Sequence, residues 1–508
     1  MAEIVLSTLN ARWVHPSLGL RYLLANMGDL ASRTALCEFV VTTPVRDLAE
    51  RLVGEKPSIV GFGVYIWNVA ATTRLIRLLK LVAPDVVVVV GGPELRGDGL
   101  CTEIAEIADY VLVGQADLEF AALCRSILSE HPPEVKIVRC QPPDVLALRS
   151  PYPFYESVGI ADKFHYIELS RGCPFRCEFC LSSLDERVVS FPLDETLVQI
   201  DGLLSRGAKH LKFVDRTFNL KISTATRVLS FLLERWKPGR FFHFEMIPDR
   251  FPTPLRDLVS QFPPGSIQLE VGIQTFNPVV AKAIGRRQDE ERVADNLGYL
   301  TEHTHAHIHA DLIAGLPLED LDSFASGFDR LYALKPQEIQ VGILKRLWEA
   351  PIQRHQKSCR MVFEADPPYE ILSHETMDFQ TLQDLRRFAR YWDLVANSGN
   401  FRRSLPQLLG SGSSFWGFWE FSSWLFLRLG ATHAISLKRL VSAVFDFLAE
   451  KRNVPRKVAA PLVFEDYASG GRPDVPSCLK GYLPQEARAR SAHSARATSP
   501  KRQARHLS

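Results

Sequence analysis

Cysteine is scarce in this chain, since nine residues out of 508 are too few for the dense set of disulfides that holds small secreted domains together. A strong charge of either sign is also missing, because 60 Lys and Arg residues nearly balance 58 Asp and Glu residues. The resulting formal net charge of +2 gives no case for nucleic acid or an anionic membrane as the main partner. A hydrophobic content of 46% and a charged content of 23% are those of an ordinary globular protein.

Long apolar runs are absent too. No uncharged run reaches the length of a membrane span, and the richest segment, 415–427, is interrupted by Glu420. The first six residues hold an acidic residue and no basic region, which does not match a signal peptide. The sequence therefore predicts two or three domains in a reducing compartment, the cytoplasm, with no membrane partner.

Three of the cysteines nevertheless lie together, because Cys173, Cys177 and Cys180 follow C-x3-C-x2-C spacing. Thiolates this close can hold three irons of a [4Fe–4S] cube. The next cysteine is Cys359, so one iron would stay open to bind a small molecule, as in catalytic metal sites. A zinc knot is the alternative. Zinc usually takes four nitrogen or sulfur ligands in two close pairs, and no second pair follows nearby.

The same stretch resembles the signature of the radical SAM enzymes, with Phe179 before the last cysteine and the family-like segment 168–172 ahead of the first. This resemblance implies that the open iron binds S-adenosylmethionine (SAM) and that an electron from the cluster cleaves it to methionine and a 5′-deoxyadenosyl radical. It assigns Cys173, Cys177 and Cys180 as catalytic cluster ligands and places Phe179 beside the cofactor. It also implies an electron donor such as flavodoxin or ferredoxin.

Residues 1–135 alternate short apolar runs with amphipathic ones. The five valines of 86–90 are typical of a strand that is buried on both faces. Alternating strands and helices predict a doubly wound, Rossmann-like parallel sheet, with its ligand beyond the carboxyl ends of the strands. Glycines follow several of these strands and would let the backbone approach a ligand closely. The candidates at these strand ends are Gly63, Gly91, Gly92, Pro93 and Gly114.

Together with the cysteine motif, these strand ends resemble the cobalamin-binding domain that precedes many radical SAM barrels. The resemblance implies that the glycines and Pro93 hold cobalamin. The chain departs from the D-x-H-x-x-G pattern whose His binds cobalt, because only His15 lies in the loop after the first strand. His15 either ligates cobalt or is a hydrogen-bonding loop residue near the dimethylbenzimidazole tail.

Residues 136–160 are rich in proline and read as a linker. Six strand–helix units follow in 161–366 and predict a partial (β/α)6 barrel. Carboxyl ends of barrel strands are where sites are built, which suggests cofactor-binding roles for four polar residues. These are Asp215, Glu245, Glu270 and Gln274. The structural alternative is that the carboxylates are buried partners of Arg250 or Arg286.

Residues 367–484 read as a helical C-terminal domain whose aromatic stripe at 415–421 is expected to be core. Residues 485–508 read as a flexible basic tail. The histidines at 303, 305, 307 and 309 alternate and would share one strand face, yet no cysteine or carboxylate completes a second metal set. The predicted fold class is therefore α/β, with a Rossmann-like domain, a partial barrel and a helical domain.

Several blocks, including 182–187, 242–250 and 270–278, resemble one subgroup of cobalamin-binding radical SAM proteins, whose C-terminal domain is of the DUF4080 type. That resemblance implies [4Fe–4S], SAM and cobalamin as cofactors, and methylation of an unactivated carbon as the reaction. Radical cyclisation or oxidation is an alternative, as are a non-catalytic cobalamin sensor or carrier with a structural cluster and a zinc-stabilised interaction protein. No motif identifies the small-molecule or biosynthetic-intermediate substrate.

Overall fold

The structure is a computed structural model that describes residues 2–472, 474–483 and 501–506. The chain packs as two compact units. The first contains Met1–Arg216, Lys345–Arg354 and Phe363–Glu370. The second contains Thr217–Leu344, His355–Val362 and Ile371–Ser508. The first unit therefore joins the predicted cobalamin-binding residues to the start of the predicted barrel, and two later segments return to it.

A six-stranded parallel sheet organises the start of the first unit, with the strand order β2-β1-β3-β4-β5-β6. This order reverses at β1, as the doubly wound prediction requires. The valine run forms a buried strand as predicted, with Val88, Val89 and Val90 almost fully inaccessible. The strands are β1 (Ile4–Asn10), β2 (Thr34–Val40), β3 (Ile59–Gly63), β4 (Val87–Gly91), β5 (Tyr110–Val113) and β6 (Ile137–Arg139).

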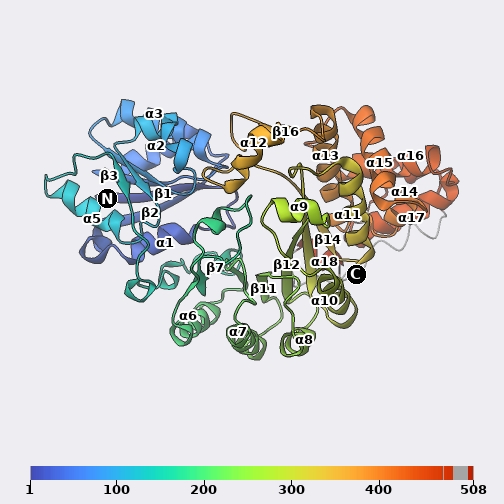
Figure 1. The fold of residues 1–508 in the computed structure, drawn as a ribbon, viewed down its shortest axis with the longest axis horizontal. Coiled ribbons are helices and arrows are strands. Elements are labelled where there is room, and N and C mark those ends of the chain that lie inside the picture. The colour runs from blue at the N-terminus through green and yellow to red at the C-terminus, as the bar shows by residue number, and fades with distance from the viewer. Residues whose placement is uncertain (1, 473, 484–500, 507–508) are drawn as a thin grey trace. The chain divides into compact units, whose positions relative to one another are not determined.

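Helices cover both faces of this sheet (Figure 1). The apolar sides of α2 (Val45–Gly54), α3 (Val69–Val82) and α4 (Glu103–Ile107) pack into one core cluster. The helices α1 (Leu18–Ala25) and α5 (Glu119–Leu128) pack into another on the opposite face. Burial on both faces explains why the strands read as near-continuous apolar runs.

The predicted linker 136–160 has more structure than its composition indicates. Its residues Ile137–Arg139 form β6, which pairs with β5 at the edge of the sheet. Short 3-10 turns follow at Val145–Ala147 and Tyr152–Phe154. The strand is only three residues long and largely exposed, so it carries none of the apolar alternation by which a strand is recognised.

A second six-stranded sheet has the strand order β14-β13-β12-β11-β10-β7, in which neighbours are consecutive units of a strand–helix repeat. All six strands coincide with the predicted ones. They are β7 (Phe164–Ile167), β10 (His210–Phe213), β11 (Phe241–Met246), β12 (Ile267–Gln274), β13 (His307–Ala314) and β14 (Glu338–Ile343). The helices between them are α6 (Leu193–Ser205), α7 (Ile222–Glu234), α8 (Thr253–Ser260), α9 (Pro278–Ala283), α10 (Glu290–His303) and α11 (Leu321–Ala333). A short ribbon of β8 (Ser170–Arg171) and β9 (Val189–Ser190) flanks the cysteine loop.

Residues after the barrel are mainly helical, as predicted. The phenylalanines of the aromatic stripe belong to the core, because Phe415 and Phe418 are fully buried against Phe388. Phe421 is fully buried against Phe447, whereas Trp416 is 40% exposed. The helices are α12 (His355–Ser358), α13 (Phe379–Trp392), α14 (Leu405–Leu409), α15 (Ser414–Leu429), α16 (Leu437–Glu450), α17 (Arg456–Ser469) and α18 (Lys501–His506). A π-helical turn, Asp393–Asn397, extends α13, and β15 (Val362–Phe363) and β16 (Ile371–Ser373) precede it.

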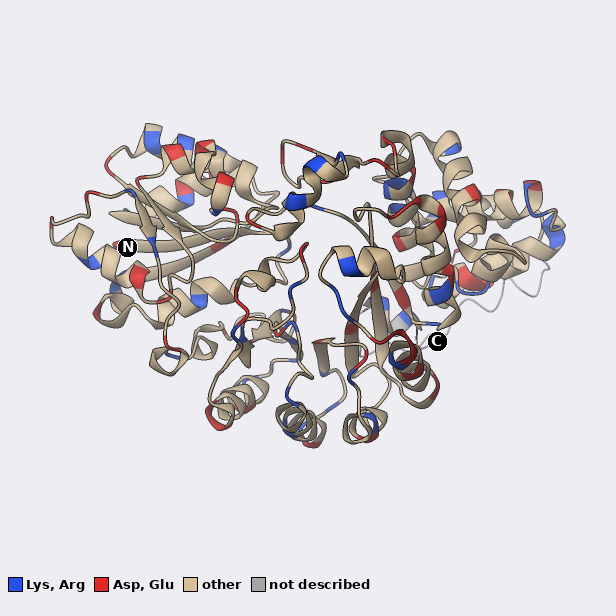
Figure 2. Cartoon of the chain, in the orientation of Figure 1, with Lys and Arg blue, Asp and Glu red and all other residues tan. Residues whose placement is uncertain are grey.

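The last part of the basic tail is helical. Lys501–His506 forms α18, whose Arg502 and Gln503 pair with other side chains of the second unit, whereas 484–500 lie outside the described residues. Elsewhere basic and acidic residues are interspersed along the elements (Figure 2). Among the residues described, no helix is long and apolar enough to cross a membrane.

Candidate functional site

The three cysteines of the motif lie on the loop that follows β8, in the first unit. Cys173 is buried at 7% exposure, while Cys177 and Cys180 are half-buried, and no described cysteine forms a disulfide. Phe179 is half-buried beside them. Burial raises the pKa of the Cys173 thiol, against an opposing hydrogen bond from the Phe175 backbone. A bound metal overcomes such a shift because it deprotonates a coordinating thiol outright.

Tight backbone packing holds this loop in place. The Cys173 N–H donates to the Asp185 carbonyl at 2.9 Å. Gly172 has a φ of +97°, and a Cβ there would lie 2.1 Å from the Arg187 carbonyl oxygen, so no other residue fits. Within the described ranges, no three His, Cys, Asp or Glu side chains gather as ligands of one metal ion.

Arg171, two residues before Cys173, anchors the loop through a buried ion network. Its guanidinium donates to both Glu168 carboxylate oxygens at 3.0 Å and to Asp117 Oδ2 at 3.0 Å. It also donates to Gln115 Oε1 at 3.0 Å. Burial acts to lower the pKa of Arg171, but the hydrogen bonds to Glu168 and the charge of Asp117 outweigh burial and raise it. The residue is therefore a fixed cation between the cysteine loop and the β5–α5 loop.

Asp215 follows β10 and is buried, but it contacts the chain rather than an open space. Its carboxyl accepts from the Leu169 N–H at 2.9 Å and from Ser170 Oγ at 2.6 Å. Burial raises the pKa of Asp215 to about 7, although both hydrogen bonds act in the opposite direction. Asp215 thus fixes the segment that leads into the cysteine loop, and its cofactor-binding role stays a prediction.

A cavity of about 340 Å³ opens at the carboxyl ends of β3, β4 and β5 in the first unit. The predicted residues Gly63, Gly91, Gly92 and Gly114 line it, whereas Pro93 lies beyond Gly92 without being part of the lining. Its remaining walls come from β5, the β5–α5 loop, α1, α5 and the segment before the cysteines. They include the apolar residues Leu18, Leu20, Leu112 and Phe120 and the polar residues Gln115, Asp117, Glu168 and Arg171.

The chain bends sharply at the rim of this cavity. Gly92 has a φ of +127°, and a Cβ there would lie 2.4 Å from the Val64 carbonyl oxygen. Only glycine allows the β3 and β4 ends to approach each other this closely. The next acidic residue, Glu94, is buried and accepts a hydrogen bond from Trp348 Nε1 at 3.0 Å and another from the Tyr369 hydroxyl. Trp348 and Tyr369 belong to the two later segments that return to the first unit.

His15 lies outside the lining of this cavity. Its Nδ1 is 2.8 Å from the Tyr166 hydroxyl, and its ring stacks on Phe164 with centroids 5.3 Å apart. Burial and the nearby charges of Arg12 and Lys212 lower its pKa, so the imidazole is neutral at pH 7. These contacts are consistent with a hydrogen-bonding role for His15, which was the alternative to cobalt ligation.

The other three polar candidates lie in the second unit, on neighbouring strands. Glu245 of β11 and Glu270 of β12 are register partners, and Glu270 contacts His243 Nε2 at 2.8 Å. Gln274 ends β12 with a φ of +72°, where the register to β13 shifts. Arg286 donates to the Gly272 carbonyl beside this bulge. The structure therefore places Glu245 and Glu270 side by side on neighbouring strands. Gln274 lies at the carboxyl end of the strand that carries Glu270.

Only two of the alternating histidines lie on a strand, because β13 begins at His307 and leaves positions 303 and 305 before it. His307 Nε2 contacts Glu338 at 2.9 Å, and His309 Nε2 contacts the Gln340 side chain at 3.1 Å. Both histidines of β13 thus contact polar side chains of the neighbouring strand β14.

Sequence reasoning missed the polar wall formed by Gln115, Asp117 and Arg171. A signal existed, since Gln115 and Asp117 lie within three residues of Gly114, which follows a predicted strand end. The clamp of Trp348 and Tyr369 on Glu94 had no signal, because more than 250 residues separate the partners.

Three protein families match the chain in succession. The B12 binding domain matches residues 5–124, the Radical SAM superfamily matches 167–330, and the Protein of unknown function (DUF4080) matches 357–504. The first match contains all of the residues that line the cavity except Glu168 and Arg171. The second match contains these two residues and the cysteine loop. Together they give the chain its cofactors, which are cobalamin, SAM and a [4Fe–4S] cluster.

Named relatives share part of this arrangement. The "Cobalamin-dependent radical SAM methyltransferase TokK" of Streptomyces tokunonensis is 24% identical over 358 residues, which cover 62% of this chain and 51% of that protein. The "2-(S-pantetheinyl)-carbapenam-3-carboxylate methyltransferase" of Streptantibioticus cattleyicolor is 24% identical over 340 residues, covering 59% and 49%. The chain thus spans about half the length of these relatives.

Solved structures share the fold. The radical S-adenosylmethionine methyltransferase TsrM from Kitasatospora setae aligns with a TM-score of 0.60 at 16% identity, covering 84% of this chain and 99% of that one. The cobalamin-dependent S-adenosylmethionine radical enzyme OxsB aligns with a TM-score of 0.61 at 14% identity, covering 96% and 82%. The succession of the three family matches, with the cysteine loop inside the second, identifies the chain as a B12-binding radical SAM protein with a DUF4080 region.

Proposed function

We propose that this chain is a cobalamin-dependent radical SAM enzyme that methylates an unactivated carbon of a small-molecule biosynthetic intermediate. One observation carries the proposal. Glu168 and Arg171 line the glycine-rich cavity and directly precede Cys173, so a single buried ion network joins the cobalamin cavity to the cluster loop. A protein that merely carried cobalamin would need no such link to a cluster.

The residues present fit both metal cofactors. Cys173, Cys177 and Cys180 would hold the cluster, and Asp215 fixes the backbone that enters their loop. The cavity has the apolar walls and few polar groups that organic ligands select, and its volume of about 340 Å³ suits a bicyclic aromatic tail better than a whole corrin. Gly63, Gly91, Gly92 and Gly114 would hold that tail. When bound, cobalamin supplies methyl-transfer chemistry and the cluster supplies the electron that cleaves SAM.

The second unit supplies the groups for SAM and substrate in this proposal. Glu245 and Glu270, adjacent on β11 and β12, offer carboxylates to hydroxyl or amino groups, and His243 fixes the orientation of Glu270. Gln274 offers an amide beyond them. We propose these three as SAM-binding residues, with flavodoxin or ferredoxin as the electron donor. Two of the relatives are methyltransferases by name, which supports methyl transfer over radical cyclisation or oxidation.

The test is anaerobic reconstitution with iron, sulfide and hydroxocobalamin, followed by reductant, SAM and cell extract. We expect 5′-deoxyadenosine and a product heavier by one methyl group, both detected by mass spectrometry. Cys177→Ala should abolish both, whereas Cys101→Ala, which changes an exposed cysteine in the same unit, should leave both intact. Bound cobalamin without any nucleoside would identify a carrier, and a product that has lost hydrogens would identify cyclisation or oxidation.

A further inference from the structure

The starts of three neighbouring barrel strands carry buried polar side chains. Gln268 is the second residue of β12, while His307 and Glu338 are the first residues of β13 and β14. All three are at most 5% exposed. Parallel strands begin at one common edge, so these groups lie at the end of the barrel opposite to the carboxyl ends where cofactors bind. A buried carboxylate at this edge needs a charged partner.

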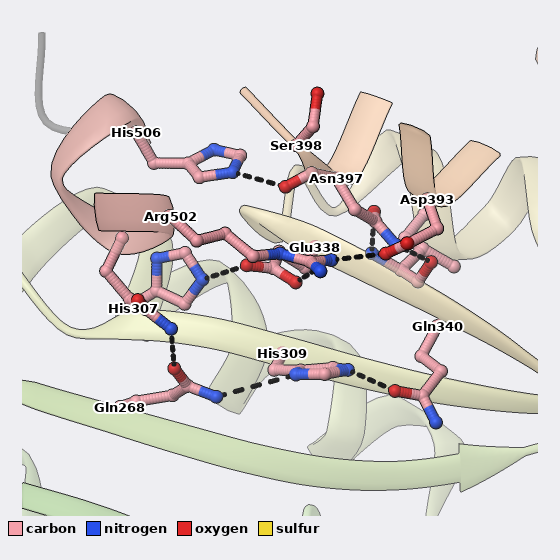
Figure 3. A network of polar contacts seen from close by, with 12 residues as sticks. Gln268, His307, His309, Glu338, Gln340, Asp393, Asn397, Ser398, Arg502 and His506 are labelled. Atoms are coloured by element: carbon pink, nitrogen blue, oxygen red, sulfur yellow. Dashed lines mark hydrogen bonds and ion pairs between the residues drawn. The ribbon is translucent and has the colours of Figure 1, made fainter. Parts of the chain in front are cut away.

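The helix α18 supplies that partner, as Figure 3 shows. Arg502 Nη2 lies 2.5 Å from Glu338 and 2.7 Å from Asp393, so one guanidinium joins a barrel strand to the π-helical turn. Gln503 Nε2 donates to Gln268 Oε1 at 2.8 Å. Burial would raise the pKa of Glu338, but the hydrogen bond from His307 and the charge of Arg502 outweigh it and lower the pKa to about 2.

The far end of α18 is held by the last residue of the π-helical turn and by the segment after it. His506 Nε2 donates to the Asn397 carbonyl at 2.9 Å, and Arg505 Nη1 donates to Asn400 Oδ1 at 2.8 Å. Gly399 makes room for this approach, because a Cβ there would lie 3.0 Å from the Arg505 Cβ. The helix therefore contacts barrel strands along one side and the helical region along the other, all within the second unit.

A six-residue helix is too short to persist in water by its own hydrogen bonds, so its helical form depends on the surface that receives it. That surface is acidic at Glu338 and Asp393, whereas the helix is basic. We propose that the surface formed by Gln268, His307, Glu338 and Asp393 is a docking site for the chain's own basic helix α18. Docking shields the starts of β12, β13 and β14 from water.

The polar contacts at these strand starts continue from strand to strand. Gln268 lies 3.5 Å from His309, and His309 lies 3.1 Å from the exposed side chain of Gln340, so polar contacts link β12, β13 and β14 (Figure 3). Gln503 of α18 covers the Gln268 end of this series, which would face water without the helix. The docking itself does not rest on the proposed radical chemistry.

The test is hydrogen–deuterium exchange of the full chain without cofactors, comparing wild type with Arg502→Ala. Removing one partner of a buried ion pair should speed amide exchange on the order of a hundredfold at the starts of β12, β13 and β14. Arg403→Ala is the matched control, because Arg403 also lies in the helical region and forms an exposed pair with Glu465. This control should exchange like wild type.

Arg502→Lys keeps the positive charge without the forked guanidinium and should restore part of the protection. Circular dichroism of each variant shows that the chain remains folded. Unchanged exchange at the three strand starts in a folded Arg502→Ala chain would overturn the docking, as would equal loss in Arg403→Ala. Because the measurement needs neither cobalamin nor SAM, failure of the docking and failure of the proposed reaction are told apart.

Discussion

Replacing Arg171 by alanine should destabilise the first unit far more than replacing any exposed arginine. The substitution leaves Glu168 and Asp117, whose side chains are 12% and 10% exposed, without the guanidinium that neutralises both. Removing one partner of a buried ion pair costs about 3–5 kcal/mol. For a unit of this size, each kcal/mol lowers the melting temperature by about 2–4 °C, so the expected loss is roughly 6–20 °C.

The matched control is Arg176→Ala. Arg176 lies on the same loop and pairs with Glu186, but the two side chains are 74% and 48% exposed, so this pair contributes about 0–1 kcal/mol. The assay is thermal unfolding of the cofactor-free proteins followed by circular dichroism, with cobalamin affinity measured by absorbance titration. Arg171→Ala should bind cobalamin more weakly because its side chain forms part of the cavity wall. Equal melting temperatures for the two variants would refute this account of the buried network.

Two further substitutions test other parts of the structure. Burial, opposed only by the hydrogen bond from Thr275, raises the pKa of Glu319 to about 8, so its contribution to stability is full below about pH 4.5 and is lost as pH rises through 8. Glu319→Gln should therefore remove a pH-dependent loss of up to about 5 kcal/mol, seen as a smaller drop in melting temperature from pH 5 to pH 9 than in wild type; an identical drop would contradict the assignment. Gly92→Ala should cost more than about 2 kcal/mol and weaken cobalamin binding, because its Cβ would strike the Val64 carbonyl. Gly54→Ala, which meets nothing within 4 Å, should change neither melting temperature nor affinity, and equal effects of the two would count against the cavity geometry.

Local patterns predicted much of the architecture. The valine run of β4 and the six barrel strands carry their signal in a few adjacent residues, and so does the spacing of the cysteines. The cofactor-binding role of Asp215 stays a prediction. Its contact with the Leu169 backbone could not be predicted, because a carboxylate at a strand end looks the same in sequence whether it faces a ligand or the chain. Whether an acidic residue is satisfied by the chain itself depends on contacts that no short pattern contains.

The prediction of a flexible tail rested on composition alone, and composition gave no sign of the helix α18. Composition rules detect order through apolar burial, whereas Arg502 is held by Glu338 and Asp393, more than a hundred residues earlier in the chain. The ion network of Arg171 escaped prediction for the same reason, since Asp117 is 54 residues away. Ion pairs between residues so far apart in the sequence can be identified only from the folded structure.

The clamp on Glu94 sets an order of events during synthesis. The sheet of the first unit is complete in sequence at Arg139, but the Glu94 carboxylate gains the Trp348 indole and the Tyr369 hydroxyl only when those residues have been translated. At about 5–20 residues per second, the ribosome needs roughly 10–50 s to cover that interval. During this time the β4 end remains unfinished beside the cavity that cobalamin would enter. An isolated fragment of residues 1–135 would carry the same defect permanently.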